Sequence, residues 1–245
     1  MFVPQDLPHR LALASIAELP LGRKARVLDV GCGEGRLLDL LKTAGFNARG
    51  VESSAKAVAA AQRKGLAVKR AAWPDFADGP YDAIVMCRFL HHAKALDQSV
   101  LRAHELLRPR GFLLVDDFAF AEATPELARW THRILQMLMS NGVASPARDP
   151  FLTGILRARG RIGPWRHGQA KAFHHGAAMA RAIQIAFGNL KAKTVPYAYR
   201  YLVRTLPPRK AFGALAEALF FLECEAGKKI NGFLIGRQFV ARKER

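Results

Sequence analysis

The sequence has few cysteines and no long uninterrupted hydrophobic run. Its three cysteines, Cys32, Cys87 and Cys224, stand far apart among 245 residues, and this odd number and wide spacing favour neither a disulfide framework nor a metal site. No stretch of roughly eighteen apolar residues lacks a charge, so no transmembrane helix is expected. The first residues lack the basic-then-apolar order of a signal peptide, and we therefore expect a reduced, cytoplasmic chain.

Acidic residues are scarce in the second half of the chain. Residues 121–245 hold only 7 of the 20 Asp and Glu residues but 21 of the 38 Lys and Arg residues. Most of the net charge of +18 therefore belongs to this half. Such an excess can attract an acidic small substrate, a nucleic acid or an anionic membrane, and it can equally be a solvated charged face.

Short apolar runs alternate with amphipathic helical segments in the first half. The runs that predict strands are 25–30, 48–52, 66–71, 81–87 and 112–115, and the segments that predict helices are 7–19, 35–44, 55–64 and 93–107. This alternation predicts βαβ units and an α/β fold with a doubly wound sheet. It stops near Asp117, where residues 122–188 favour helices; strand patterns return at 192–203 and 232–241, with a helix expected over 208–226 between them.

Three glycines follow the first expected strand within five residues, and a helix is expected directly after them. Bare backbone in this position lets the N–H groups approach a ligand closely. A dinucleotide-binding turn would have its third glycine at position 36, where this chain has Arg36, so the spacing favours a smaller nucleoside ligand. Glu52 ends the next strand, where a carboxylate can bind both ribose hydroxyls or cap the following helix.

These motifs, in this order, resemble the class I S-adenosylmethionine-dependent methyltransferases, in particular their small-molecule branch and an uncharacterised bacterial subgroup. The resemblance covers about residues 26–118. It rests on VLDVGCGEG at 27–35, GVES at 50–53, YDAIVMC at 81–87, FLHH at 89–92 and LRPRGFLLV at 107–115. It implies a Rossmann-like sheet of seven strands, the last of them antiparallel, and S-adenosyl-L-methionine as the cofactor.

By this resemblance, residues 1–245 form one methyltransferase domain. Residues 1–119 are its cofactor-binding half. Residues 120–190 are a helical insertion between strands five and six, at the position where relatives build a substrate lid. Residues 191–245 supply the sixth and seventh strands and the helix between them.

The resemblance also implies a set of cofactor-binding residues: Asp29, Gly31, Cys32, Gly33, Glu52, Ser53, Trp73, Cys87 and Arg88. In this set Asp29 fixes the glycine turn by hydrogen bonding, and Glu52 holds the ribose. Trp73 stands where many relatives have an acid, so an aromatic contact with the adenine is expected there. Cys87 and Arg88 follow the fourth strand and pass close to the sulfonium.

His91 and His92 also follow the fourth strand, at the end of the sheet where ligands bind in open α/β folds. An imidazole can take up a proton near neutral pH, so both are candidate general bases. The alternative is that they form part of the pocket wall. Methyl transfer is an in-line displacement, and a base is optional unless the nucleophile is poor.

The expected acceptor is a small molecule, acidic or apolar, with an O, N or C nucleophile. One alternative is RNA or another polyanion, and another is a cofactor-binding module without catalysis. The fourth strand ends in Cys-Arg-Phe-Leu at 87–90 and lacks the Asn/Asp-Pro-Pro-Tyr/Phe signature of enzymes that methylate amino groups on adenine or glutamine. The sequence therefore favours a small acceptor, while it specifies neither the acceptor atom nor the oligomeric state.

Overall fold

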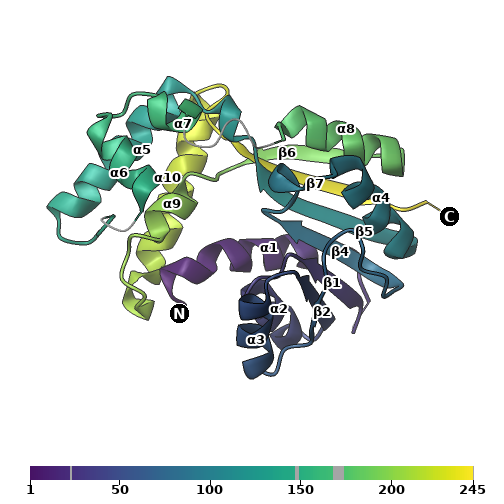
Figure 1. Cartoon of the computed structure of the whole chain (residues 1–245). Coiled ribbons are helices and arrows are strands. Elements are labelled where there is room, and N and C mark those ends of the chain that lie inside the picture. Colours follow the sequence, from purple (N-terminus) through teal and green to yellow (C-terminus); the bar gives the residue numbers. More distant parts are fainter. Residues whose placement is uncertain (23, 147–148, 168–173, 245) are drawn as a thin grey trace. The chain divides into compact units, whose positions relative to one another are not determined.

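The computed structural model describes residues 1–245 except 23, 147–148, 168–173 and 245, so part of the expected insertion lies outside the described residues. The chain divides into two compact units (Figure 1). We call the first the sheet unit; it comprises His9–Asp117, Gly176–Lys193 and Arg237–Arg245. We call the second the helical unit; it comprises Met1–Pro8, Phe118–His175 and Thr194–Gly236.

The strands form one seven-stranded sheet in the order β3-β2-β1-β4-β5-β7-β6. They are β1 (Arg26–Val30), β2 (Asn47–Glu52), β3 (Val68–Arg70), β4 (Tyr81–Cys87), β5 (Leu107–Phe118), β6 (Lys191–Val195) and β7 (Gly236–Arg242). The first five are parallel. The Arg110 amide donates to Lys243 and the Ala119 amide to Ile235, so β7 runs against β5. The predicted mixed sheet is confirmed.

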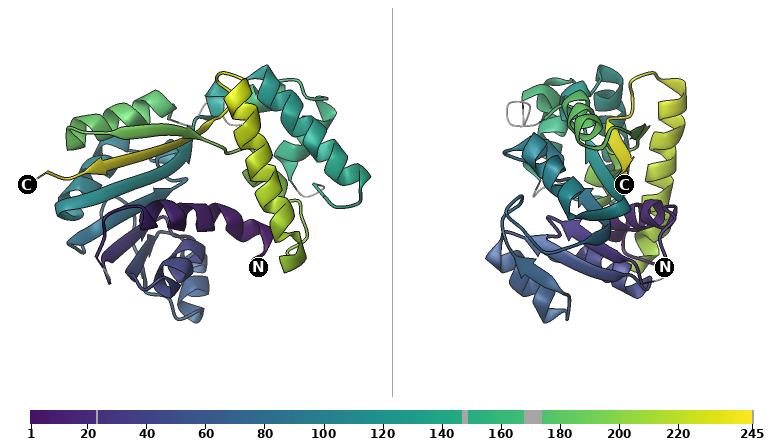
Figure 2. Two further views of the ribbon diagram at one scale, coloured as in Figure 1. Left: turned by 180° about the vertical axis from the view of Figure 1, so that it is seen from behind. Right: turned by 90° about the vertical axis from the view of Figure 1, so that its right-hand side faces the viewer.

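Helices cover both faces of the sheet (Figure 2). Those of the sheet unit are α1 (Leu7–Ala17), α2 (Arg36–Thr43), α3 (Ala55–Arg63), α4 (Leu96–Leu106) and α8 (Gly176–Phe187), with a short 3₁₀ helix, η2 (Leu90–His92). Side chains alternate between the faces along β4. Ile84 and Met86 pack in the cluster that includes α4 and α8, whereas Ala83 and Val85 pack in the cluster that includes α1 and α2.

The fifth strand is longer than the four residues predicted. Residues 109–111 lie inside β5 at an irregularity, where the register shifts between the pairs Tyr81–Leu107 and Ala83–Phe112. Arg110 takes a left-handed φ of 65° there. The chain therefore passes a bulge at this point and keeps its direction.

The helical unit contains most of the predicted insertion. Its elements are α5 (Pro125–Ser140), α6 (Pro150–Arg157), α7 (Gly163–His167), α9 (Tyr199–Val203) and α10 (Gly213–Lys229), with 3₁₀ helices η1 (Pro4–Asp6), η3 (Phe120–Glu122) and η4 (Lys210–Phe212). The helical character predicted for this region is confirmed. The last helix of the expected insertion, α8, belongs instead to the sheet unit and packs against α4.

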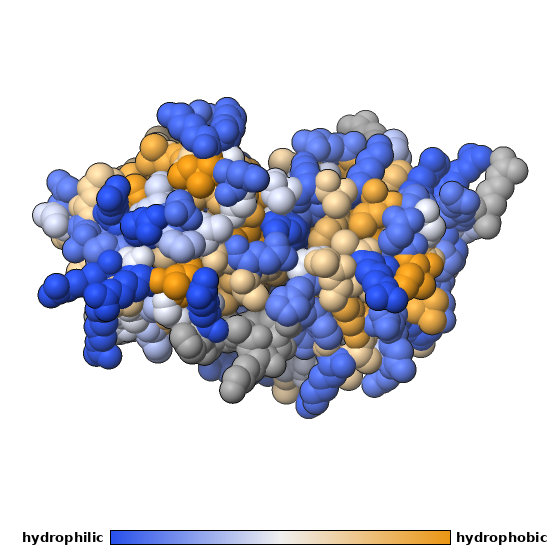
Figure 3. Space-filling view, turned by 90° about the horizontal axis from the view of Figure 1, so that it is seen from above, coloured by the Kyte–Doolittle hydropathy of each residue, from blue (hydrophilic) through white to orange (hydrophobic). Residues whose placement is uncertain are grey.

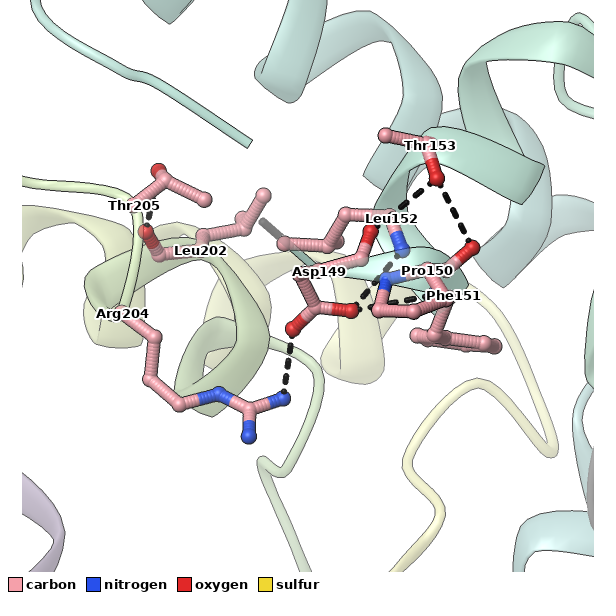
Figure 4. Close-up of polar contacts among 8 residues, drawn as sticks. All are labelled: Asp149, Pro150, Phe151, Leu152, Thr153, Leu202, Arg204 and Thr205. Atoms are coloured by element: carbon pink, nitrogen blue, oxygen red, sulfur yellow. Dashed lines mark hydrogen bonds and ion pairs between the residues drawn. The ribbon is translucent and has the colours of Figure 1, made fainter. Parts of the chain in front are cut away.

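Asp149 ties two parts of the helical unit together (Figure 4). One carboxylate oxygen accepts hydrogen bonds from the amides of Phe151 and Leu152, at 3.0 and 3.2 Å, and so caps α6. The other lies 3.1 Å from the guanidinium of Arg204, which directly follows α9. Such a cap is worth about 1 kcal/mol, while a half-exposed ion pair adds less.

The sixth strand is shorter than predicted, and the second half of the range 192–203 is the helix α9. Pro196 has no N–H group to donate to a neighbouring strand, so the strand ends before it. After Pro196, the buried carboxylate of Glu223 on α10 accepts three backbone hydrogen bonds. The donors are the amides of Tyr197, Ala198 and Tyr199, at 2.7, 2.9 and 2.7 Å. The strand predicted over 192–203 is therefore wrong beyond Val195.

In the part of the chain that the structure describes, we find no helix that could span a membrane. The face drawn in Figure 3 has many hydrophilic side chains with smaller hydrophobic areas among them. On α10, Phe221 and Leu222 are neighbouring large hydrophobic side chains that are exposed.

Candidate active site

The glycine turn after β1 has the backbone conformation that its residues allow. Gly31 and Gly33 have φ angles of 68° and 54°, in the left-handed region that favours glycine. A Cβ on Gly31 would lie 2.8 Å from the ring of Phe89, whereas none of the described atoms lies within 4 Å of a Cβ on Gly33. Gly31 thus accommodates the neighbouring ring, and Gly33 leaves room beside the turn for a ligand.

The third glycine serves packing. Gly35 precedes α2 with a φ of 80°, and a Cβ there would collide with the side chain of Leu66. This residue therefore lets α2 approach the chain before β3.

Glu52 connects the glycine turn to the start of α3. Its Oε2 accepts the Gly33 amide at 3.0 Å, and its Oε1 accepts the Ser54 amide at 2.8 Å. Ser53 Oγ lies 3.4 Å from the same Oε1. Ser54 itself caps α3 by accepting the Ala57 amide. The carboxylate is thus held beside the backbone of the turn before any ligand arrives.

Asp29 is buried one strand away from Glu52. The pKa of Asp29 is raised to about 7, first by burial and then by the charge of Glu52, while the charge of Arg88 opposes this. The predicted hydrogen bond from this side chain to the turn is not found among the described residues. Two carboxylates with like charge make this a place that favours a cation.

Cys32 lies within the turn and is half-buried. Burial raises the pKa of its thiol, followed by the charges of Asp29 and Glu52. The neutral thiol is therefore the form at neutral pH, and Cys32 fits a contact role here better than a nucleophilic one.

Arg88 follows β4 in a conformation that is rare for a residue with a side chain, with a φ of 55°. Its amide donates to the carbonyl of Asp116 at 2.8 Å, which fixes the chain at the carboxyl end of the sheet. Its side chain is exposed, whereas that of Cys87 is half-buried.

The two histidines form a chain of hydrogen bonds with Asp117 at the end of β5. His91 Nδ1 lies 2.7 Å from Asp117 Oδ1, and the His91 amide donates to Asp117 Oδ2 at 3.1 Å. His91 Nε2 lies 3.1 Å from His92 Nδ1. Because an ionised carboxylate only accepts, His91 Nδ1 carries a proton. The Nε2 of a neutral His91 then accepts from His92 Nδ1, which leaves His92 Nε2 with a lone pair.

His92 is poised to be neutral. Burial lowers the pKa of His92, and protonation of His91 would lower it further, while the charge of Asp117 opposes this. The structure thus brings both predicted histidines together and adds Asp117, which our sequence analysis missed. The signal was present, since Asp116 and Asp117 stand near the carboxyl end of the fifth strand, where functional side chains gather in this class of sheet.

Trp73 is anchored to α4. Its indole N–H donates to the carbonyl of Ser99 in α4 at 3.1 Å, and its ring stacks on Phe76 with centroids 6.4 Å apart. The half-buried ring packs on the core beneath α4 and α8. A contact of Trp73 with an adenine stays a prediction.

The residues present fit a cationic nucleoside. Gly33 leaves open space at the turn, Glu52 is held beside it, and Asp29 adds a second carboxylate nearby. Carboxylates favour a positive charge, and Glu52 is a ribose-binding group in the right position.

Comparisons with known proteins agree with this geometry. Residues 3–160 match the family described as "Methyltransferase domain". A malonyl-[acyl-carrier protein] O-methyltransferase of Enterobacter lignolyticus is 30% identical over 156 residues, which cover 61% of each chain. The match thus spans less than two thirds of that relative.

Solved structures share the fold. Phosphoethanolamine N-methyltransferase 2 of Haemonchus contortus, in complex with S-adenosyl-L-methionine, matches with a TM-score of 0.59 and 13% identity, over 97% of this chain and 53% of that one. An S-adenosylmethionine-dependent methyltransferase of Mesorhizobium loti matches with a TM-score of 0.56 and 17% identity, over 94% and 96%. Together with the family match, the glycine turn and Glu52, this shows that the chain belongs to the class I S-adenosylmethionine-dependent methyltransferases.

Proposed function

We propose that this chain transfers a methyl group from S-adenosylmethionine to a small-molecule acceptor. The observation that carries the proposal is the carboxylate of Glu52, held 3.0 Å from the Gly33 amide beside an open glycine turn. Two of the proteins that the chain resembles act, by their names, on a malonyl-[acyl-carrier protein] and on phosphoethanolamine. These names support a small or carrier-borne acceptor and leave its reacting atom open.

The cofactor-binding roles follow the motif. Glu52 binds the ribose hydroxyls, with Ser53 beside it, and Gly31, Cys32 and Gly33 line the methionine and ribose. Trp73 contacts the adenine, Cys87 and Arg88 border the sulfonium, and Asp29 supplies negative charge close to it. The cofactor supplies a methyl group on a positively charged sulfur, which makes that group electrophilic.

His91 and His92 handle the proton that a hydroxyl or amine acceptor releases. His92 Nε2 is the base atom in this proposal, because the hydrogen bonds from Asp117 through His91 leave it with a lone pair. Burial keeps His92 neutral, and a neutral imidazole can take up a proton at neutral pH. Asp117 touches neither cofactor nor acceptor and acts as a positioning residue.

The helical unit is the candidate for acceptor recognition. Trp165 is fully buried there and contacts Phe120, Phe151 and Tyr201, with ring centroids 4.9 to 5.8 Å apart. Phe151 and Tyr201 at the border of this cluster are only half-buried, and their exposed ring surface suits an apolar or conjugated group. A substrate lid built from the predicted insertion, residues 120–190, is our proposal for this region.

Calorimetry with S-adenosylmethionine and its demethylated product tests cofactor binding. We expect the Glu52→Ala substitution to weaken binding at least tenfold, because two ribose hydrogen bonds are lost. Glu34→Ala is the matched control, since Glu34 is an exposed acid in the same turn. No heat with the unchanged protein would overturn the proposal.

A screen with cofactor carrying a labelled methyl group identifies the acceptor class. We expect label in the metabolite fraction of a cell extract. The net charge of +18 favours a second candidate, methyl transfer to RNA or another polyanion, and label in total RNA would support it. Binding of cofactor with no labelled product in any fraction would support a module without catalysis.

A further inference from the structure

The sheet unit has a cavity that is remote from the glycine turn. A groove of about 1130 Å³ lies between the end of α1, the start of β5, the strand β6 and the end of β7. We call it the basic groove. Its lining includes Arg110 and Phe112, which lie near the amino end of β5. The glycine turn and Glu52 lie instead at the carboxyl ends of β1 and β2, which run parallel to β5. The two sites are therefore at opposite ends of the strands.

Four positively charged side chains line the basic groove without an ion pair among the described residues: Arg110, Lys191, Lys193 and Arg242. A fifth cation, Lys243, is already engaged, because its Nζ donates to the carbonyls of His104 and Leu107 at 2.9 Å. Glu18 and Glu244 are the acids in the lining. Arg242 is partly engaged as well, because its Nε donates to the Arg110 carbonyl at 3.4 Å. The positive excess that can meet negative charge therefore rests mainly on Arg110, Lys191 and Lys193.

The groove also has apolar lining. Leu19, Phe112 and Val240 line it and remain half-buried beside the cluster that includes α1 and α2. On the other face of β7, Phe239 is buried in the cluster that includes α4 and α8. Apolar surface with charged groups around it is the composition of a protein–protein contact.

The outer edge of the sheet forms one side of the groove. β6 is the last strand in the sheet order, and four of its five residues are exposed. Lys191 and Lys193 are two residues apart, so they lie on the same side of the strand, about 7 Å apart. Lysines on an edge strand also discourage pairing with unrelated strands. That role explains neither the apolar lining nor the cations contributed by β5 and β7.

From these features we propose that the basic groove docks an extended acidic segment of a partner protein, which pairs with β6 as an eighth strand. Acidic residues at every second position of such a segment match the spacing of Lys191 and Lys193. Apolar residues between them face the other side of the sheet. The inference does not depend on the acceptor of methyl transfer.

A single-stranded nucleic acid fits less well. Such ligands need aromatic rings on which bases stack. The one aromatic ring in the described lining is Phe112, and the guanidinium of Arg242 already lies 5.5 Å from its centroid. A strand of protein uses the exposed edge and the lysines together, which is why we favour it.

The test is an NMR titration of the ¹⁵N-labelled full chain with a capped octapeptide that alternates Glu and Val. We expect saturable shifts of β6 and β7 amides with a Kd below about 1 mM. Replacing Glu by Gln in the peptide tests the charge, and methylating alternate peptide nitrogens tests strand pairing. Both changes should weaken binding at least tenfold.

The protein variant is Lys191→Glu with Lys193→Glu, which we expect to raise the Kd at least tenfold. The matched control is Lys56→Glu with Lys210→Glu, the same charge change at exposed sites outside the groove, which should alter the Kd less than threefold. Unsaturable shifts, or equal loss in both double variants, would overturn the proposal. Tighter binding of an octameric RNA to the same amides would overturn it in favour of a nucleic acid.

Discussion

The buried carboxylates of the two units have different kinds of partner. In the helical unit, Glu223 accepts three backbone amides, whose positions the fold determines. In the sheet unit, Asp117 faces the ring of His91, and Asp29 lies near Glu52 and Arg88. Burial raises the pKa of both Glu223 and Asp29 to about 7. Fixed backbone dipoles thus oppose the cost of burial at Glu223, whereas the neighbours of Asp117 and Asp29 are ionisable groups, one of which, Glu52, adds to the cost at Asp29.

The kind of partner distinguishes a structural carboxylate, Glu223, from the carboxylates of the candidate active site, Asp117 and Asp29. Backbone amides cannot change their charge, so Glu223 stabilises the start of α9 under all conditions in which it is ionised. Histidine, a second carboxylate or a bound cation can change the charge around Asp117 and Asp29. Substitutions at these positions should therefore have different kinds of effect, and the amide isostere of each carboxylate is the sharpest probe.

The largest effect is expected for Asp117→Asn. Once the Asn oxygen accepts the His91 amide, its NH₂ group faces His91 Nδ1 and donates to it. The rings of His91 and His92 then both change to the tautomer that is protonated at Nε2. His92 Nε2 thereby gains a proton and no longer has a lone pair. We expect methyl transfer to fall about 10²- to 10⁴-fold with unchanged affinity for S-adenosylmethionine.

Imidazole ¹⁵N spectra give a readout of this reversal without any acceptor. The unchanged protein should show protonated Nδ1 in both His91 and His92, and Asp117→Asn should show protonated Nε2. The control is Asp116→Asn, one residue earlier on β5. Protonated Nε2 on His92 in the unchanged protein would rule out the relay.

The next effect in size is a loss of stability in Glu223→Ala. Three amides at the start of α9 lose their acceptor in a buried site, and we expect a loss of about 3 kcal/mol in the free energy of unfolding. Urea titration measures it. Glu217→Ala on the same helix is the control, because Glu217 is exposed and should change stability by less than about 0.5 kcal/mol.

A loss below about 1 kcal/mol in Glu223→Ala would contradict the cap. Such a result would mean that water replaces the carboxylate as the acceptor of the three amides. Glu223 would then have no structural role that distinguishes it from Asp29 and Asp117.

Local patterns were enough to predict the sheet unit. Strict alternation and short apolar runs located β1, β2 and β4 within about a residue, and the glycine turn indicated the ligand class. Asp117 could have been found by asking which polar residues end the fifth strand. The link from Asp117 through His91 to His92 could not, because it depends on ring orientations that packing sets.

The helical unit shows where local patterns fail. The tyrosines at every second position from 197 to 201 have the periodicity of a strand, yet they lie at the start of α9. The deciding group, Glu223, is more than twenty residues away in the sequence and acts through the backbone. No local propensity contains that contact, so tertiary structure overrides the pattern.

The smallest effect, and the one that separates the two raised pKa values, is expected for Asp29→Asn. The unfolded Asp29 loses its proton near pH 3.8, whereas the folded one keeps it up to about pH 7. Folding therefore takes up a proton between these values, and the contribution of Asp29 to stability falls as the pH rises through them. An amide removes this loss, so we expect Asp29→Asn to stabilise the protein at pH 8 by on the order of 2 kcal/mol and by little at pH 4.

Glu223→Gln provides the comparison, with the opposite sign at pH 8. The Gln amide has one acceptor oxygen, and its NH₂ group would face a backbone N–H at the start of α9. We therefore expect Glu223→Gln to destabilise the protein, although the pKa of Glu223 is raised to about 7, like that of Asp29. Urea titrations of both variants at pH 4 and pH 8 measure the two signs. Asp29→Asn should also weaken the binding of S-adenosylmethionine, because negative charge near the sulfonium is lost. If both amides shifted stability in the same direction at pH 8, burial alone would govern these carboxylates, and the distinction between fixed and ionisable partners would fail.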